Sequence, residues 1–249
     1  MKKLKEFLMA FIILFAVVSF VYFIYQSGSG KQNRELARRM IEISPRGGPP
    51  ETIEGLRQAI VLYEDQIERN VREGVQTGVY WKILATRLAD RGMHNDALSA
   101  LERAVYFNAE DPTLYYLTGV SAGIVAKSTV GFSPNAERER ERYYRLAENS
   151  YKYALELDIT YTRAMYGLGV LYVFELDRPQ EAIVHLERYL SILPSDVYTM
   201  FILARAYYMI EDHSRAVELY DRIADRTKDK KIREEAFNNR DLVMGRLYE

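Results

Sequence analysis

The feature that most constrains this chain is a pattern of apolar and small residues that returns at a period close to 34 residues. Residues 78–111 carry the pattern at Trp81, Leu84, Ala85, Leu88, Gly92, Ala97, Leu101 and Ala104. Residues 197–230 carry it again, at Met200, Leu203, Ala204, Tyr207, Ala216, Tyr220 and Ile223. A repeat of this length is typical of chains built from stacked supersecondary units, each of which contacts mainly its neighbours.

The spacing inside one unit predicts two helices joined by a turn. The fourth, seventh, eighth and eleventh places lie on one face of a first helix. The small residue at the twentieth place, Ala97 or Ala216, allows a second helix to approach the first closely. Gly92 falls between the two helices, where it lets the chain turn. We therefore expect an all-α protein.

Two further stretches fit the same pattern with changes in length. Residues 162–196 carry it at Met165, Leu168, Gly169, Tyr172, Ala182, Leu186 and Pro194. Residues 112–161 carry it at Tyr115, Gly119, Ala122, Ala147, Tyr151 and Ala154, around an insertion at 127–141. Residues 51–77 are interpreted as one helix of a degenerate first unit. Residues 231–249 have one apolar face and are interpreted as a closing helix over the last unit.

This pattern resembles the tetratricopeptide repeat (TPR), whose signature is W-x2-L-G-x2-Y, then A-x3-F, then a final A and P. The resemblance implies an all-α TPR α-solenoid of about four repeats, with a degenerate first unit and a C-terminal capping helix. It is specific for the fold, because unrelated helical bundles do not keep Ala at the twentieth place. It says little about function, since TPR arrays serve many roles.

The N-terminus has a different character. Residues 1–6 form a basic tail, and residues 7–25 are apolar except for Ser19. As a helix, residues 7–25 would be about 28 Å long, close to the hydrocarbon thickness of a bilayer. A cleaved signal peptide is the alternative, but its apolar core is usually shorter and an A-x-A cleavage site is absent. We expect one transmembrane helix, followed by a linker with a short helix at 26–50.

The charges beside this predicted span suggest its orientation. Lys2, Lys3 and Lys5 favour a cytoplasmic N-terminus, because short basic tails are retained on the inner side. The basic residues after the span argue the other way, but long domains translocate largely regardless of charge. We expect a single-pass protein of the bacterial cytoplasmic (inner) membrane with its C-terminal domain in the periplasm. The chain has no Cys, which suits that compartment.

Composition and motifs argue against several functions. The 34 Lys and Arg balance 35 Asp and Glu, so the chain lacks the basic surface of a nucleic-acid binder. His94, His185 and His213 show no zinc-helix spacing, and no phosphate-binding or serine-nucleophile motif occurs. We expect no enzyme activity, no catalytic residue, no metal, no cofactor and no small-molecule substrate.

The resemblance implies a ligand-binding groove lined by the first helix of each repeat. The places that face this groove in TPR proteins correspond here to Lys82, Tyr116, Arg163, Tyr166, Phe174, Tyr198, Phe201, Arg205 and Tyr208. Such a wall would suit an amphipathic helix or an extended peptide with apolar anchors and some acidic groups. The alternative is that these aromatic rings pack within the array.

The insertion carries one apolar ring, Phe132, which is a candidate contact for a partner or a residue packed onto the array. The charged run that follows, from Glu137 to Arg142, is interpreted as a solvated helix turn whose charges pair with one another.

We therefore expect a membrane-anchored TPR scaffold that binds protein partners and contacts the lipid bilayer through residues 7–25. Membrane-anchored TPR families include scaffolds of envelope assemblies, such as the collar of some periplasmic flagellar motors, and accessories to secretion. The alternatives are a chaperone-like accessory that holds unfolded peptides in the aromatic groove, and an adaptor that faces the cytoplasm. No motif selects among them.

Overall fold

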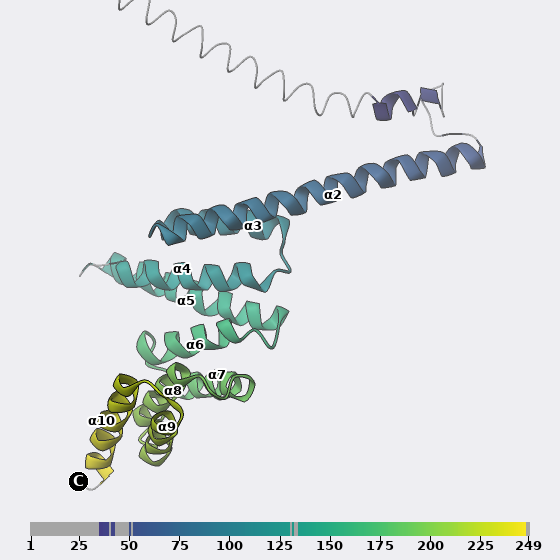
Figure 1. The fold of residues 1–249 in the computed structure, drawn as a ribbon. Helices are drawn as coiled ribbons and strands as arrows, with labels where there is room; N and C mark the ends of the chain where they lie inside the picture. The colour runs from purple at the N-terminus through teal and green to yellow at the C-terminus, as the bar shows by residue number, and fades with distance from the viewer. Residues whose placement is uncertain are drawn as a thin grey trace, which may run out of the picture. The chain divides into compact units, whose positions relative to one another are not determined.

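The computed structural model describes residues 35–39, 41–42, 50, 52–129, 131 and 134–247, and their regular structure is α-helical (Figure 1). The chain divides into two compact units, residues 1–73 and residues 74–249, which are described separately. The transmembrane helix expected at 7–25 lies outside the described residues, as does Phe132. Of the helices that are described, none is both long and apolar enough to cross a bilayer.

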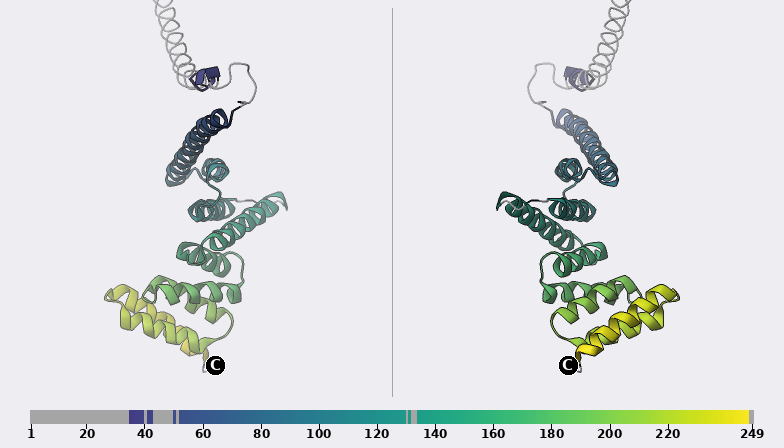
Figure 2. Two further views of the ribbon diagram at one scale, coloured as in Figure 1. Left: turned by 90° about the vertical axis from the view of Figure 1, so that its right-hand side faces the viewer. Right: turned by 90° about the vertical axis from the view of Figure 1, so that its left-hand side faces the viewer.

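The second unit is a stack of helical hairpins, as the repeat predicts. Helix α4 packs on α5, α6 on α7 and α8 on α9, and the last helix, α10, packs on α9. The first helices of successive repeats also meet, since α6 contacts both α4 and α8 (Figures 1 and 2). The bounds are α3 His94–Phe107, α4 Pro112–Ser128, α5 Pro134–Leu157, α6 Thr162–Phe174, α7 Pro179–Ile192, α8 Val197–Met209, α9 His213–Arg226 and α10 Lys230–Leu247.

Aspartates cap several of these helices. The side chain of Asp111 accepts from the backbone N–H of Thr113 at the start of α4. The Asp196 side chain accepts from two backbone N–H groups at the start of α8. The Asp212 side chain accepts from the backbone N–H of Arg215 at the start of α9. Each cap satisfies backbone donors that have no partner inside the helix, and so fixes where the helix begins.

The turns inside three hairpins share one backbone conformation. Gly92, Asp177 and Glu211 all have positive φ, at 76°, 52° and 63°. Gly92 and Glu211 occupy the same place of their repeats, between the first and second helix. The turn predicted at Gly92 is therefore present, and it recurs where the sequence has no glycine to signal it.

The core lies where the small residues of the repeat bring helices together. The alanines at the twentieth place, Ala97, Ala147, Ala182 and Ala216, have no exposed surface. One apolar cluster runs from α4 to α10. A second, smaller cluster joins Ala85 and Trp81 to α3 and to Leu114 of α4. The repeat pattern therefore identifies the buried face correctly.

The start of the array differs from the expectation. We placed a separate degenerate helix at 51–77 and the first repeat helix after it. Instead one helix, α2, runs without a break from Ile53 to Asp90. The physical reason is that this stretch contains no proline, and its glycines are tolerated inside a helix. The break that we expected at residue 77 is absent.

The insertion at 127–141 lengthens two helices more than it forms a loop. Helix α4 has 17 residues and α5 has 24, whereas α6 has 13 and α7 has 14. At the start of α5, Arg140 and Glu137 lie 3.8 Å apart and both are exposed, as the solvated-turn interpretation requires.

Candidate functional site

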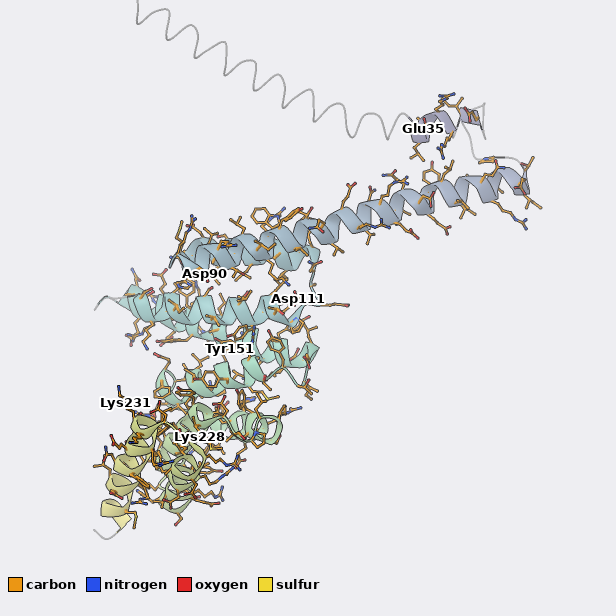
Figure 3. The ribbon with its side chains drawn as sticks, in the orientation of Figure 1. Glu35, Asp90, Asp111, Tyr151, Lys228 and Lys231 are labelled. Carbon is orange, nitrogen blue, oxygen red and sulfur yellow. The ribbon has the colours of Figure 1, made fainter. Side chains whose placement is uncertain are left out.

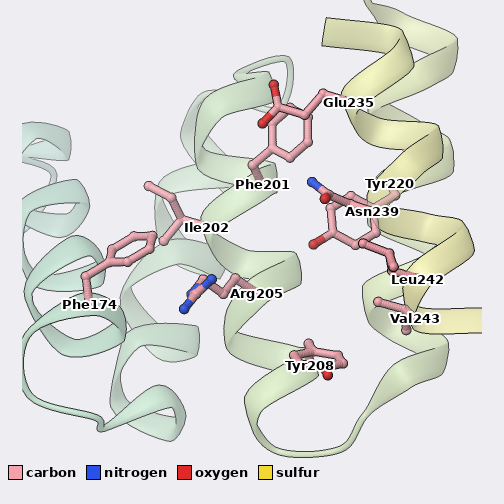
Figure 4. Close-up of a pocket in the computed structure, with 10 residues that line it drawn as sticks. All are labelled: Phe174, Phe201, Ile202, Arg205, Tyr208, Tyr220, Glu235, Asn239, Leu242 and Val243. Carbon is pink, nitrogen blue, oxygen red and sulfur yellow. The ribbon is translucent and has the colours of Figure 1, made fainter. Parts of the chain in front are cut away.

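A cavity of about 440 Å³ lies between the last two repeats and helix α10 (Figure 4). Its walls come from the end of α6, from one face of α8, from α9 and from α10. The residues that line it are Phe174, Phe201, Ile202, Arg205, Tyr208, Tyr220, Glu235, Asn239, Leu242 and Val243. This volume falls within the range of ligand pockets, roughly 300–1,000 Å³.

Aromatic rings form much of this cavity. The rings of Phe201 on α8 and Tyr220 on α9 are 5.9 Å apart, and the guanidinium of Arg205 lies 5.2 Å from the centre of the Phe174 ring. The Phe174 side chain is 48% exposed although it is large and apolar. Exposed apolar surface next to an oriented cation is a combination that binding sites use.

Two opposite charges also line the cavity. Arg205 is exposed, and within the part of the chain that the structure describes neither it nor Glu235 makes an ion pair. Burial raises the pKa of Tyr220, Arg205 acts to lower it, and Glu235 acts to raise it. Both charges therefore act on the same tyrosine and are available to a partner.

Helix α10 is held firmly against the last repeat. Ala236 has no exposed surface and Val243 is 5% exposed, so this face of α10 belongs to the core. The Arg240 guanidinium donates to the Asp221 carboxylate of α9 at 3.1 Å. Leu242, on the cavity side, is 71% exposed. The helix thus packs on the last repeat through Ala236 and Val243, while Val243 and Leu242 also line the cavity.

The structure brings together only part of the predicted groove. Phe174, Phe201, Arg205 and Tyr208 line the cavity. Lys82 does not, because it lies on α2, which contributes no residue to the cavity; its ammonium pairs with the Asp111 carboxylate at 2.9 Å. Asp111 stands at the start of α4, where Figure 3 labels it, and is far along the chain from the cavity residues.

The remaining predicted residues lie outside this cavity. Arg163 stands 6.0 Å from the Tyr116 ring, and Tyr166 lies 6.1 Å from the Tyr189 ring. Tyr198 is 63% exposed. Tyr116 and Tyr166 are half-buried, which agrees with the alternative that rings on these helices pack within the array.

Much of the tyrosine content is structural. The Tyr172 hydroxyl donates to Glu148 at 2.9 Å, and the Tyr144 hydroxyl donates to Glu175 at 2.6 Å. Glu148 also accepts from Lys152 at 2.7 Å and from Arg178 at 3.0 Å. The bonds from Tyr172, Tyr144 and Arg178 connect neighbouring repeats, whereas the bond from Lys152 lies within α5. The two tyrosine hydroxyls are thus already hydrogen-bonded inside the array.

The contribution of α9 and α10 to the cavity does not follow from the repeat pattern. Tyr220 belongs to the repeat pattern, and Glu235, Asn239 and Leu242 are not among the predicted groove residues. A signal existed: Glu235, Asn239 and Leu242 are spaced four and three apart and so share one helix face. Sequence spacing does not tell, however, which face of a capping helix turns towards the array.

The three histidines do not form a site. The His185 ring stacks on Tyr172 at 6.0 Å, and burial lowers the pKa of its imidazole. Among the described residues, no three His, Asp or Glu side chains are placed to hold a metal ion. TPR repeats are generally non-catalytic scaffolds, and the cavity has the lining of a binding surface.

Residues 198–226 match the sequence pattern of the tetratricopeptide repeat family. A TPR repeat-containing protein of Borreliella burgdorferi is 22% identical over 224 residues, which cover 89% of this chain and 95% of that protein. Anaphase-promoting complex subunit 3 of Schizosaccharomyces pombe is 27% identical over 154 residues, or 60% of this chain. The matched region spans only 21% of that subunit's length.

Among solved structures, a thermophilic TPR protein of Thermus thermophilus is similar in fold, with a TM-score of 0.53 and 18% identity. The similarity covers 83% of this chain and 97% of the thermophilic protein. The matched repeat at 198–226 and this shared fold together support a tetratricopeptide repeat protein whose described residues form an all-α TPR solenoid.

Proposed function

We propose that this protein is a non-catalytic scaffold that captures a protein partner in the cavity between α6, α8, α9 and α10. The observation that carries the proposal is the combination of exposed apolar side chains, Phe174 and Leu242, with the exposed guanidinium of Arg205 in one concave surface. Aromatic and arginine side chains are the residue types that contribute most to protein–protein binding.

The chemistry of the cavity defines the partner. Its apolar surface would receive the anchor side chains of an amphipathic helix, and Arg205 would pair with a carboxylate of that helix. Helix α10 makes the site rigid, because Ala236 and Val243 hold it in the core. A preformed site needs little ordering on binding, which favours affinity for one defined partner over weak capture of many unfolded chains.

The location is part of the same proposal. The apolar run at 7–25 would anchor the protein in the bacterial cytoplasmic membrane, and the basic tail at 1–6 would leave residues 31–249 in the periplasm, within an envelope assembly. Such a tether would raise the effective concentration of the cavity for partners at the same membrane. The support for this part is the sequence pattern alone.

A photo-crosslinking experiment in the native cell tests the binding site. A photoreactive phenylalanine replaces Leu242, which is exposed at the cavity, or Tyr106, which is 76% exposed on α3 and serves as the control. We expect one discrete adduct from position 242 and none of the same mass from position 106. The adduct is then identified by mass spectrometry.

A charge reversal tests the role of Arg205 in that adduct. Arg205→Glu should abolish the adduct, because it places a carboxylate where the partner's carboxylate would bind. Arg222→Glu reverses a charge on α9 outside the cavity and should leave the adduct unchanged. An adduct that survives Arg205→Glu, or that forms equally from position 106, contradicts the site. A broad smear of adducts indicates the chaperone-like function instead.

The membrane tether is tested separately. Carbonate extraction should leave the full chain in the membrane pellet, while a variant that lacks residues 7–25 should be released. Protease added to intact spheroplasts should digest residues 31–249. Protection of that domain from protease would contradict the periplasmic orientation and support the adaptor that faces the cytoplasm.

A further inference from the structure

The first half of α2, residues 53–70, presents an apolar seam to solvent. The seam residues alternate three and four positions apart, which keeps them on one side of the helix. They are Ile53, Leu56, Ile60, Tyr63, Ile67 and, at the end, the polar Asn70. Each apolar member is exposed, from 43% at Leu56 to 73% at Ile53. Large exposed apolar surfaces on a helix usually mark an interaction site.

The seam is distinct from the face that α2 already buries in the first unit. Gly55 and Ala59 are buried, and Ala59 is 6% exposed. Those two residues lie on a neighbouring side of the helix, with the side chains of Leu62 and Gln66 partly buried along the same line. Among the described residues of this unit, the seam is thus left over after the other contacts of α2 are made.

The identity of the seam residues selects the occupant. In heptad notation Ile53, Ile60 and Ile67 all fall at position a, and Leu56, Tyr63 and Asn70 fall at position d. β-Branched residues at a with leucine at d favour a parallel two-stranded coiled coil. We propose that residues 53–70 of two copies of this chain pair in this way, so that the protein is a parallel dimer.

Asn70 separates the parallel arrangement from the antiparallel one. In a parallel pair Asn70 lies at a d position opposite Asn70 of the second copy, and the two amides can hydrogen-bond. The Asn70 Oδ1 atom already accepts from the Gln66 Nε2 atom of the same helix at 2.9 Å, so its N–H groups are the ones that need a partner. In an antiparallel pair each Asn70 would lie opposite an Ile53 side chain, which offers these N–H groups no acceptor. Although an antiparallel pair would place Arg57 near Glu64, exposed ion pairs contribute little compared with buried amide N–H groups that have no acceptor.

The length of the seam sets the strength of the contact. It covers about two and a half heptads, fewer than long coiled coils use. We expect a reversible dimer with a dissociation constant on the order of micromolar. This inference does not depend on the proposed partner site, which lies in the other unit of the chain.

The test compares two adjacent side chains of equal exposure. Ile60 is 54% exposed on the seam, and Val61 is 56% exposed just beside it. If the chain were a monomer, glutamate would be tolerated equally at either position. For a seam dimer, sedimentation equilibrium of the full chain in detergent should show that Ile60→Glu weakens dimerisation at least about 100-fold, while Val61→Glu leaves it near the unchanged value.

Disulfide formation tests the arrangement, because the chain has no cysteine of its own. Ile53→Cys alone should form a disulfide dimer on mild oxidation, because residue 53 lies opposite residue 53 of the second copy only in a parallel pair. Asp65→Cys, at an exposed position on the side of the helix away from the seam, is the control and should form no disulfide dimer.

Three results would overturn the proposal. A full chain that remains monomeric at high micromolar concentration would exclude the dimer. Equal effects of Ile60→Glu and Val61→Glu would exclude the seam as its interface. A disulfide between Ile53→Cys and Asn70→Cys chains, without Ile53→Cys homodimers, would show the antiparallel pair.

Discussion

The ring of Tyr151 on α5 lies directly against the backbone of Gly167 on α6. A Cβ atom at Gly167 would lie 2.7 Å from the Cζ atom of that ring, closer than two carbon atoms can approach. Gly119 on α4 meets the same ring from another repeat helix, since its Cβ would lie 2.5 Å from the Tyr151 Cε1 atom. One tyrosine (labelled in Figure 3) thus joins two repeats through two glycines.

Gly167→Ala should therefore destabilise the solenoid. Alanine has the better helix propensity, by about 1 kcal/mol, but the clash with Tyr151 should cost about 1–3 kcal/mol and should exceed that gain. Gly123→Ala on α4 is the control, because its Cβ would meet nothing within 4 Å. Urea unfolding should show a lower midpoint for Gly167→Ala and an equal or higher one for Gly123→Ala. A higher midpoint for Gly167→Ala would mean that the ring moves aside without cost.

The carboxylate of Glu148 should make the protein sensitive to acid. Burial alone raises the pKa of Glu148, but the hydrogen bonds from Lys152, Arg178 and Tyr172 outweigh it, so the pKa is lowered from its ordinary value of 4.5. A lowered pKa in the folded state means that this stabilisation is complete above the unfolded pKa and is lost as the pH falls from about 4.5 through the folded pKa.

Glu148→Gln removes that titration. At pH 7 it should destabilise the chain by about 2 kcal/mol, because charged hydrogen bonds are replaced by weaker ones. The free energy of unfolding should be measured for the variant and the parent from pH 7 to pH 3. The difference between the two should be smaller at pH 3 than at pH 7. Asp225→Asn, at an exposed position of α9, is the control for loss of a carboxylate, and its free energy of unfolding at pH 7 should equal that of the parent within about 0.5 kcal/mol. A difference in the free energy of unfolding that stays constant with pH would show that Glu148 does not cause the acid sensitivity.

Glu211 and Gly92 occupy equivalent places in their repeats and share a left-handed backbone conformation. We expect substitutions at these two places to change the stability in opposite directions. Glu211 has a φ of 63°, which costs a side-chain-bearing residue about 1 kcal/mol, so Glu211→Gly should stabilise the last repeat by roughly that amount. Gly92 has a φ of 76°, so Gly92→Ala should destabilise the first repeat by about 1 kcal/mol. Thermal unfolding of both variants measures the difference. Shifts of the same sign would show that something other than backbone conformation dominates.

Helix α10 should be required for stability through one face only. Ala236→Asp places a carboxylate at a position with no exposed surface, and should destabilise the chain by about 3 kcal/mol or more. Leu242→Asp, at 71% exposure on the cavity side, should change the free energy of unfolding by less than about 0.5 kcal/mol. Guanidinium titrations of the two variants test this. Equal loss at both positions would mean that the cavity face of α10 is also part of the core.

The sequence predicts much of this fold because the repeat specifies the same contacts several times. Ala97, Ala147, Ala182 and Ala216 are fully buried, as a small residue between two helices must be. Where the repeat is interrupted the predictions weaken. The helix at 51–77 was expected to end, yet α2 continues to Asp90, since a helix stops only where a residue or a contact ends it.

The candidate site was less predictable. The pattern of first-helix positions identified Phe174, Phe201, Arg205 and Tyr208, which line the cavity. It also identified Lys82, which instead pairs with Asp111, because a position that faces outward can still meet a neighbouring cap. Periodicity gives the face on which a side chain lies, but not which neighbour it contacts.

By itself the sequence determined the helical repeats and their buried alanines, because these follow from local spacing along each helix. Only the tertiary structure decided that Glu235, Asn239 and Leu242 of α10 complete a cavity with Arg205 of α8. These three residues lie about thirty or more positions after Arg205 along the chain. They meet it because α10 packs on the last repeat by burying Ala236 and Val243, and the spacing of residues along one helix does not specify that contact.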